Sequence, residues 1–368
     1  MTGPTVRTGR TAWAFQLQPG EQELLSNYLS RVAHGHGSTA GAFCRLHLSD
    51  SWYWTRDVDR GIAIAAHERL SSLAGVDVEV IERLTLRRWI EGLTPASYRA
   101  KSLAAITPWV TAAGLSQANR RHPALSYCPQ CLDERGVAVK AWRLVFHTQC
   151  AVHRRPLIDD CRMCGAFFVP HLSRHSTRHC WSCGHALSES NWMCGGARDM
   201  DEAALQMQFR MHDWLEAACN GDLRARHRMH ALRMLISVGW SGRANGRSEL
   251  AQSSAAGAES GGRRLETAPL PQRALAMRWL HELVSQWPQS FHQIADAGGL
   301  TQRTFCRLSI KDTWLLEQIE NRPAGLQRAT GRRLDAVQQT LQKPLRHNIG
   351  NWRAGRARAL MRQAVHGH

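Results

Sequence analysis

The chain has 368 residues, of which 43% are hydrophobic, and its 47 lysines and arginines outnumber 30 acidic residues to give a net charge of +17. That length suits two or three domains. No stretch is long and apolar enough to span a bilayer, and the first residues lack a secretory signal, so we expect a soluble cytoplasmic protein. The basic excess favours a polyanion such as nucleic acid, although GC-rich coding would also raise the arginine content.

The first 93 residues show the spacing of several short helices. Apolar residues from Leu24 to Ala33 fall on one stripe, and a second helix is expected from residue 38 or 39 with Phe43 and Leu46 facing inward. Residues 61–84 read as helix, turn and helix, which suits a helix-turn-helix but also any helical domain. The tandem pair Arg87 and Arg88 follows, which indicates either a phosphate contact or a solvated face.

A cysteine and histidine block between residues 128 and 183 dominates the middle of the chain. It contains four pairs, each with two residues between its members, and zinc in proteins takes four such ligands. The sequential assignment gives two sites, and an interleaved one stays open. The predicted ligands are Cys128, Cys131, Cys150 and His153 for the first site, and Cys161, Cys164, Cys180 and Cys183 for the second.

A site with four protein ligands has no position left for water or substrate, so these sites are expected to hold structure. Disulfide pairing is the alternative, and a reducing cytosol argues against it. The catalytic motif H-E-x-x-H is absent at His67-Glu68 and at His281-Glu282, and no H-x-E signature of a zinc deaminase precedes Cys128. Between the last two pairs, residues 167–169 predict a short strand and residues 171–179 an exposed basic loop.

The order of these motifs resembles the TniQ family, including its TnsD-type members, which select targets for bacterial transposons. The similarity covers about residues 20–187, and the C-terminal half carries no motif of the family. The matching segments are Leu24 to Ala33, Tyr127 to Leu132, Trp142-Arg143, Cys150 to His153, Leu157 to Gly165 and Cys180 to Gly184.

The resemblance implies a non-enzymatic adaptor that binds target DNA or a targeting complex. Its implied partners are an AAA+ regulator ATPase and, through it, a transposase. In some relatives a CRISPR effector complex finds the target and the TniQ protein docks on it. Direct DNA reading and docking on such a complex both stay open, as does a homodimer.

The second half predicts more helices and one linker. A helix is expected from Asp199, with a partner over residues 223–238. Residues 241–270 are rich in Gly, Ser and Ala, which predicts a flexible linker. Residues 290–308 have better helix-turn-helix spacing than residues 61–84, with Gly298-Gly299 at the turn, although an ordinary helical hairpin would look the same.

The fold class that follows is mostly α, with short β hairpins in the zinc module. The expected domains are 1–122 (helical, helix-turn-helix-like), 123–196 (tandem zinc module), 197–240 (helical hairpin), 241–270 (linker) and 271–368 (basic, helical). The candidate nucleic-acid contacts are Arg87, Arg88, Arg120, Arg121, Arg174, Gln302, Arg303, Arg307, Arg332 and Arg333.

Two other functions compete with the adaptor. One is a zinc-containing helix-turn-helix transcription regulator, which would bind a palindrome as a dimer without an ATPase. The other is a zinc-braced nuclease, for which the sequence lacks a convincing acidic or His/Asn cluster outside the predicted ligands. Two Zn²⁺ ions are expected as cofactors, and DNA is among the expected partners.

Overall fold

The structure, a computed structural model, describes residues 12–48, 54, 57–94, 107–113, 123–188, 200–240, 264–305 and 310–324. The chain separates into two units, Met1–Pro323 and Ala324–His368, and every element below lies in the first. No helix among the described residues is both long and apolar enough to cross a membrane.

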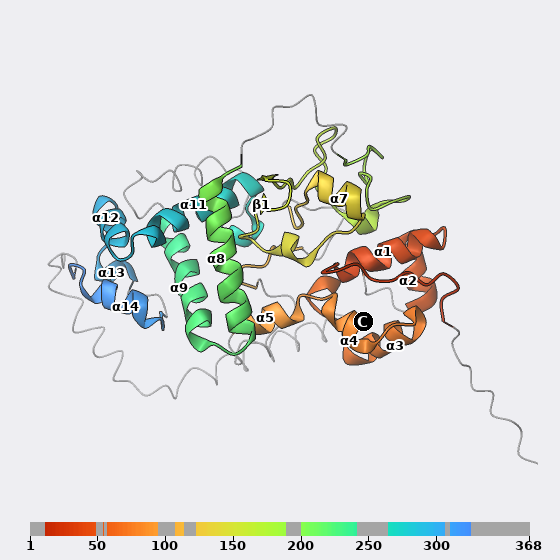
Figure 1. Cartoon of the computed structure of the whole chain (residues 1–368), viewed down its shortest axis with the longest axis horizontal. Helices are drawn as coiled ribbons and strands as arrows, with labels where there is room; N and C mark the ends of the chain where they lie inside the picture. The colour runs from red at the N-terminus through yellow and green to blue at the C-terminus, as the bar shows by residue number, and fades with distance from the viewer. Residues whose placement is uncertain are drawn as a thin grey trace, which may run out of the picture. The chain divides into compact units, whose positions relative to one another are not determined.

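The architecture is mostly helical, as predicted (Figure 1). One two-stranded antiparallel hairpin and a few isolated bridges supply the β structure of the described residues. In chain order the elements are α1 (Leu25–Gly35), α2 (Ala40–Leu48), α3 (Ile64–Ala74), α4 (Val78–Arg83), α5 (Arg87–Leu93), α7 (Pro129–Arg135), β1 (Gln149–Cys150), β2 (Arg155–Pro156), α8 (Glu202–Cys219), α9 (Leu223–Trp240), α11 (Leu270–Ser285), α12 (Gln289–Ala297), α13 (Gln302–Phe305) and α14 (Thr313–Glu320).

The N-terminal helices α1–α4 pack around their own apolar cluster, which includes Leu25, Tyr28 and Phe43. The predicted helices near residues 24 and 39 are both present, but Leu46 is 77% exposed and not inward as expected. The predicted turn after α3 is made by Gly75, whose left-handed φ of 68° suits glycine. α3 and α4 therefore form the expected short helix pair.

A second, larger cluster joins residues 123–188 to the helices that follow them. In Figure 1 α8 and α9 run side by side, and α8 also packs against α5 and α11. The helix expected from Asp199 begins instead at Glu202, because Asp201 accepts a hydrogen bond from the Ala204 N–H at 3.0 Å and caps it. The metal-module residues and the long helices thus share one core.

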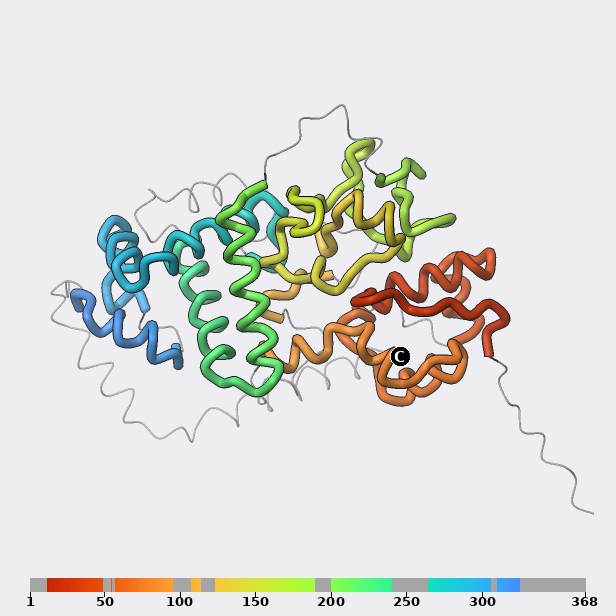
Figure 2. Tube along the Cα trace, viewed as in Figure 1, coloured from red at the N-terminus to blue at the C-terminus, as the bar shows by residue number. Residues whose placement is uncertain are grey.

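Residues 123–188 consist of turns and short helices, which Figure 2 traces in yellow and green. The hairpin pairs Gln149 with Pro156 and Cys150 with Arg155. The strand expected at residues 167–169 is reduced to one bridge, between Asp160 and Phe167. Because this segment has so little regular secondary structure, backbone hydrogen bonds within helices and strands contribute little to its stability, and other interactions must hold it in place.

Residues 264–270 correct the end of the predicted linker. Leu265 and Glu266 are buried, and the guanidinium of Arg233 on α9 donates to both carboxylate oxygens of Glu266 at 2.7 and 2.8 Å. The Ala112 N–H also donates to the Glu266 carbonyl at 2.9 Å. One leucine and one paired glutamate therefore dock a stretch whose composition resembles a linker; residues 241–263 lie outside the described residues.

Candidate metal centres and the surfaces around them

The first cluster gathers Cys128, Cys131, Cys150 and His153, whose ligand atoms all lie within 4.8 Å of one another. Cys128 precedes α7, Pro129 occupies its first turn, and Cys131 follows on the same turn. Cys150 ends β1, and the tight turn to β2 presents His153. The sulfur of Cys131 is 3.6 Å from that of Cys150 and 3.2 Å from His153 Nδ1.

The imidazole of His153 is oriented from its far side. Its Nε2 lies 3.0 Å from a carboxylate oxygen of Glu134 on α7, while Nδ1 faces the sulfurs. Metal-binding histidines usually have such a carboxylate on the second nitrogen, because it fixes the tautomer and raises the basicity of the first. No sequence motif points to Glu134, which belongs to the exposed run Asp133-Glu134-Arg135 and reads as an ordinary surface residue.

The second cluster gathers Cys161, Cys164, Cys180 and Cys183 within the same 4.8 Å limit. Two similar turns build it. The glycine that follows each pair, Gly165 or Gly184, has a φ near +70° and donates its N–H to the carbonyl of the first cysteine of that pair. A left-handed position of this kind favours glycine, which explains the repeated C-x-x-C-G. The sulfurs of Cys164 and Cys180 are 3.6 Å apart.

These distances fit a metal ion and exclude disulfides at both clusters. Four sulfurs about 2.3 Å from a central tetrahedral ion lie roughly 3.8 Å apart. A disulfide needs about 2.05 Å, whereas the Sγ–Sγ distances here are 3.6 to 3.8 Å and all these cysteines are free. The sequential grouping of pairs is the one that the structure brings together. Each cluster offers four soft or borderline donors, so each can hold one ion.

The two clusters differ in exposure. In the first, the three cysteines are buried and His153 is half-buried, whereas Cys164 and Cys183 of the second are exposed. The pKa of Cys164 is lowered to about 7: its slight burial opposes the shift, and the Ala166 N–H and the neighbouring thiols outweigh it. That thiol is therefore well suited to ligate as a thiolate.

Among the described residues, the remaining cysteines and histidines near the block do not join these clusters. Cys44 is buried in the N-terminal core, as expected, and Cys219 packs against Gly92. The ring of His171 stacks on Trp54 with centroids 4.6 Å apart and an angle of 9°. Cys194 lies outside the described residues.

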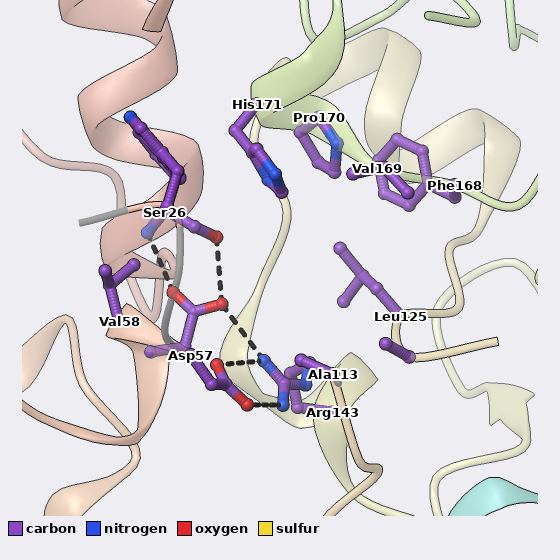
Figure 3. A pocket seen from close by; sticks show the side chains of 13 residues that line it. Ser26, Asp57, Val58, Ala113, Leu125, Arg143, Phe168, Val169, Pro170 and His171 are labelled. Carbon is purple, nitrogen blue, oxygen red and sulfur yellow. Dashed lines mark hydrogen bonds and ion pairs between the residues drawn. The ribbon is translucent and has the colours of Figure 1, made fainter. Parts of the chain in front are cut away.

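A buried polar network beside the metal module was not anticipated from sequence. Arg143, in a short helix over Lys140–Arg143, donates to both carboxylate oxygens of Asp57 and to Asp59. Asp59 in turn accepts from the Ser26 N–H and hydroxyl at 2.7 and 2.8 Å (Figure 3). Burial would lower the pKa of Arg143, but the two carboxylates hold it above its ordinary value. The segments carrying these groups are far apart in sequence.

The predicted nucleic-acid contacts on α5 already have partners. Arg87 lies 3.1 Å from Glu91 and 3.8 Å from Glu82. Arg88 bonds Glu216 of α8 at 2.8 Å, and also Asn220. These two arginines thus join helices, and their charge is countered locally.

The helix pair α12–α13 presents less of its predicted surface than expected. The side-chain amide of Gln302 donates to the carbonyls of Glu320 and Arg322, both at 2.8 Å, so it fixes α13 to the end of α14. Arg303 is exposed. The other predicted contacts, Arg120, Arg121, Arg307, Arg332 and Arg333, lie outside the described residues.

Three exposed arginines lie on the metal module. Arg174 was predicted, Arg178 follows it by four residues, and Arg135 is the last residue of α7. The Arg178 guanidinium lies against Gly136 at the end of α7, where a Cβ would come within 3.0 Å of it. Thr177 donates its hydroxyl to the Gly136 carbonyl at 3.2 Å, which joins this loop to α7. Within the described part of the chain, none of the three guanidinium groups has a hydrogen-bonding or ion-pair partner.

Comparison with known families identifies the first part of the chain. Residues 14–157 match the model of the TniQ family. The match begins before α1, includes the Arg143 network and ends after the first metal cluster, so the resemblance found in the motifs is confirmed over this range. No curated protein matches the chain.

Proposed function

We propose that this protein is a non-enzymatic target-selection adaptor of a DNA transposon. The observation that carries the proposal is the TniQ match over residues 14–157, which suggests a role associated with transposition. In this role the chain binds target DNA or a targeting complex and recruits an AAA+ ATPase, and through it the transposase. The alternatives of a transcription regulator and a nuclease have no support from the match.

Both metal centres are proposed to hold Zn²⁺ as structural ions. The donor sets of three cysteines with one histidine and of four cysteines are those that structural zinc prefers. With four protein ligands each, neither site leaves room for substrate. Zinc would supply folding free energy to a segment that has only one two-stranded hairpin and short helices.

The proposed nucleic-acid surface is formed by Arg135, Arg174 and Arg178. Arginines without a carboxylate partner are the ones available to phosphates, and each phosphate contact releases counterions. Arg87 and Arg88 are weaker candidates, because binding phosphate would require breaking their bonds to Glu91 and Glu216. Arg303, which is exposed, stays a second candidate for contact with nucleic acid.

Gel-shift titrations test this surface with the full chain and duplex DNA over a range of salt. Replacing the three arginines by alanine should weaken binding and flatten its salt dependence by about one unit of slope for each phosphate that is no longer bound. The matched control replaces Arg87, Arg88 and Arg278, each of which is paired with a carboxylate, and removes the same formal charge. Equal weakening by both triple variants would show that net charge, and not this surface, governs binding.

The adaptor role needs a separate test. If a neighbouring gene encodes an AAA+ ATPase, the purified protein should retain that ATPase in a pull-down. Deleting the gene for this protein should abolish targeted insertion while leaving the transposase catalytically competent. Tight binding to a palindromic operator without the ATPase would favour the transcription regulator. Magnesium- or manganese-dependent nicking of DNA would favour the nuclease.

A further inference from the structure

Helix α8 holds the backbone immediately before a ligand of the first metal centre. The side chain of Gln208 is 1% exposed. Its Oε1 accepts from the Thr148 and Gln149 N–H groups at 2.9 and 3.0 Å, and its Nε2 donates to the Gln149 carbonyl at 3.0 Å. Cys150 is the next residue. The position of that thiol therefore depends on a helix residue that does not touch the metal centre.

Helix α11 makes the corresponding contact to the second centre. A carboxylate oxygen of Asp159, two residues before Cys161, accepts from the Leu270 N–H at 2.8 Å. This contact satisfies a donor of the first turn of α11, which lacks an intrahelical partner. The segment that leads into the second cluster is therefore hydrogen-bonded directly to the N-terminus of α11.

Arg273, one turn further along α11, contacts the segments that precede both metal centres. Its guanidinium donates to the Ser126 hydroxyl at 2.6 Å and lies 3.8 Å from Asp159. Ser126 is two residues before Cys128, just as Asp159 is two residues before Cys161. Between them, Tyr127 and Ile158 exchange both backbone hydrogen bonds at 2.7 and 2.8 Å. A single side chain therefore contacts the two segments that lead into the two clusters.

The charge of Arg273 is poorly compensated by the protein groups alone. The residue is fully buried, and its Nε and Nη1 have no partner among the described residues. Burial lowers its pKa to about 10, although Asp159 opposes the shift. A divalent ion with four thiolates carries a net charge of −2, and one with three thiolates and a neutral histidine carries −1. Metal binding would therefore place negative charge in the module that Arg273 contacts.

We propose that metal binding and the docking of α8 and α11 stabilise each other, with Gln208 and Arg273 as the positioning residues. Removing either side chain loosens the metal centres without removing a ligand. By thermodynamic reciprocity, removing the metal ions loosens the two helices. The inference rests on metal binding by the two clusters and not on the role in transposition.

Metal release to a chromogenic chelator tests the first direction on the full-length, zinc-loaded chain. Gln208→Leu and Arg273→Met should each release zinc about tenfold faster than the unmodified chain, since each removes hydrogen bonds to buried groups. The matched controls make the same changes at exposed positions of α8: Gln206→Leu and Arg210→Met should stay within about twofold. Release at the control rate from both test variants would overturn the proposal.

Hydrogen exchange of the unmodified chain tests the reverse direction and does not depend on any variant folding. Chelating the metal should speed exchange of the Thr148, Gln149 and Leu270 amides and of the amides in α8 and α11, more than in α2 and α3 of the separate N-terminal core. Equal speeding in α2 and α3 would indicate global unfolding and would overturn a specific link, as would no change in α8 and α11. A chain that holds no metal when purified would overturn metal binding by the two clusters. That failure differs from a chain that binds metal but shows no coupling to α8 and α11.

Discussion

The guanidinium of Arg143 binds the carboxylate of Asp57 through two nitrogens, at 3.0 and 2.5 Å, with its own side chain 3% exposed. The same group reaches Asp59, which is bonded to the first turn of α1 through Ser26. One arginine beside the metal module therefore fixes the N-terminal helices to it. The ion pair between Arg143 and Asp57 is bidentate and shielded from solvent, whereas the ion pairs of Arg87 and Arg88 are exposed.

Arg143→Met should lower the free energy of unfolding by about 3–5 kcal/mol, because the buried carboxylate of Asp59 and the half-buried one of Asp57 lose their cation. Arg88→Met, which breaks an exposed pair, should cost at most about 1 kcal/mol. Denaturant unfolding at neutral pH measures both. Adding Asp57→Asn and Asp59→Asn to Arg143→Met should restore part of the loss, and an Arg143→Met variant as stable as Arg88→Met would refute a structural role for the network.

The grouping of the two Cys/His clusters was predictable from sequence, whereas the contacts of Arg143 were not. A C-x-x-C pair can be recognised from its spacing alone, because two intervening residues allow both side chains to reach the same ion. The fixed order of the pairs also made the TniQ resemblance recognisable. Arg143 instead binds residues 84 and 86 positions away, and no spacing or periodicity encodes such a pairing. The helices α1 and α2 were found by their stripe, although Leu46 on that stripe is exposed.

The same limit applies at the surface. Arg87 and Arg88 look like a phosphate clamp in sequence, yet Glu216, which binds Arg88, comes from α8, more than a hundred residues later. Composition likewise extended the linker to residue 270, because a single glutamate does not indicate that Arg233 will bury it. A pattern of charged residues predicts contacts with an external ligand only once the ion pairs within the chain are known.

Gly92→Ala should destabilise the protein by about 1–3 kcal/mol, because the added methyl overpacks a close helix contact. A Cβ at Gly92 of α5 would lie 2.7 Å from the sulfur of Cys219 and 3.1 Å from its backbone nitrogen. The control is Gly41→Ala in α2, where no atom lies within 4 Å of the added group. That change should be neutral or stabilising by up to about 1 kcal/mol, since alanine favours the helix. Thermal unfolding of the two variants gives the comparison, and equal melting temperatures would disprove the close packing of α5 on α8.

Lowering the pH from 7.5 to 5.5 should reduce stability through the buried pair His147 and His212, whose ring nitrogens lie 3.1 Å apart. Burial, aided by His212, lowers the pKa of His147 to about 3. The unfolded chain therefore gains a proton below about pH 6.5 that the folded chain does not, and stability falls as pH falls; His147 alone accounts for about 1.4 kcal/mol at pH 5.5.

The pH effect is measured by denaturant unfolding at each pH, with metal content followed in parallel. His147→Gln should flatten the pH dependence in this window. An unchanged slope in that variant would assign the effect to other groups, such as the metal ligands.

Metal analysis of the purified chain should find two zinc ions, and Cys131→Ser and Cys180→Ser should each reduce the count to about one, because a four-ligand centre weakens steeply when it loses a thiolate. The matched control is Cys44→Ala. Cys44 belongs to the N-terminal apolar cluster and to neither Cys/His cluster. Burial raises the pKa of its thiol to about 12, so the thiol stays protonated. Its removal should therefore leave two ions bound. Loss of both ions from each single serine variant would show that the centres do not fill independently. A count of two in both variants would exclude these cysteines as ligands.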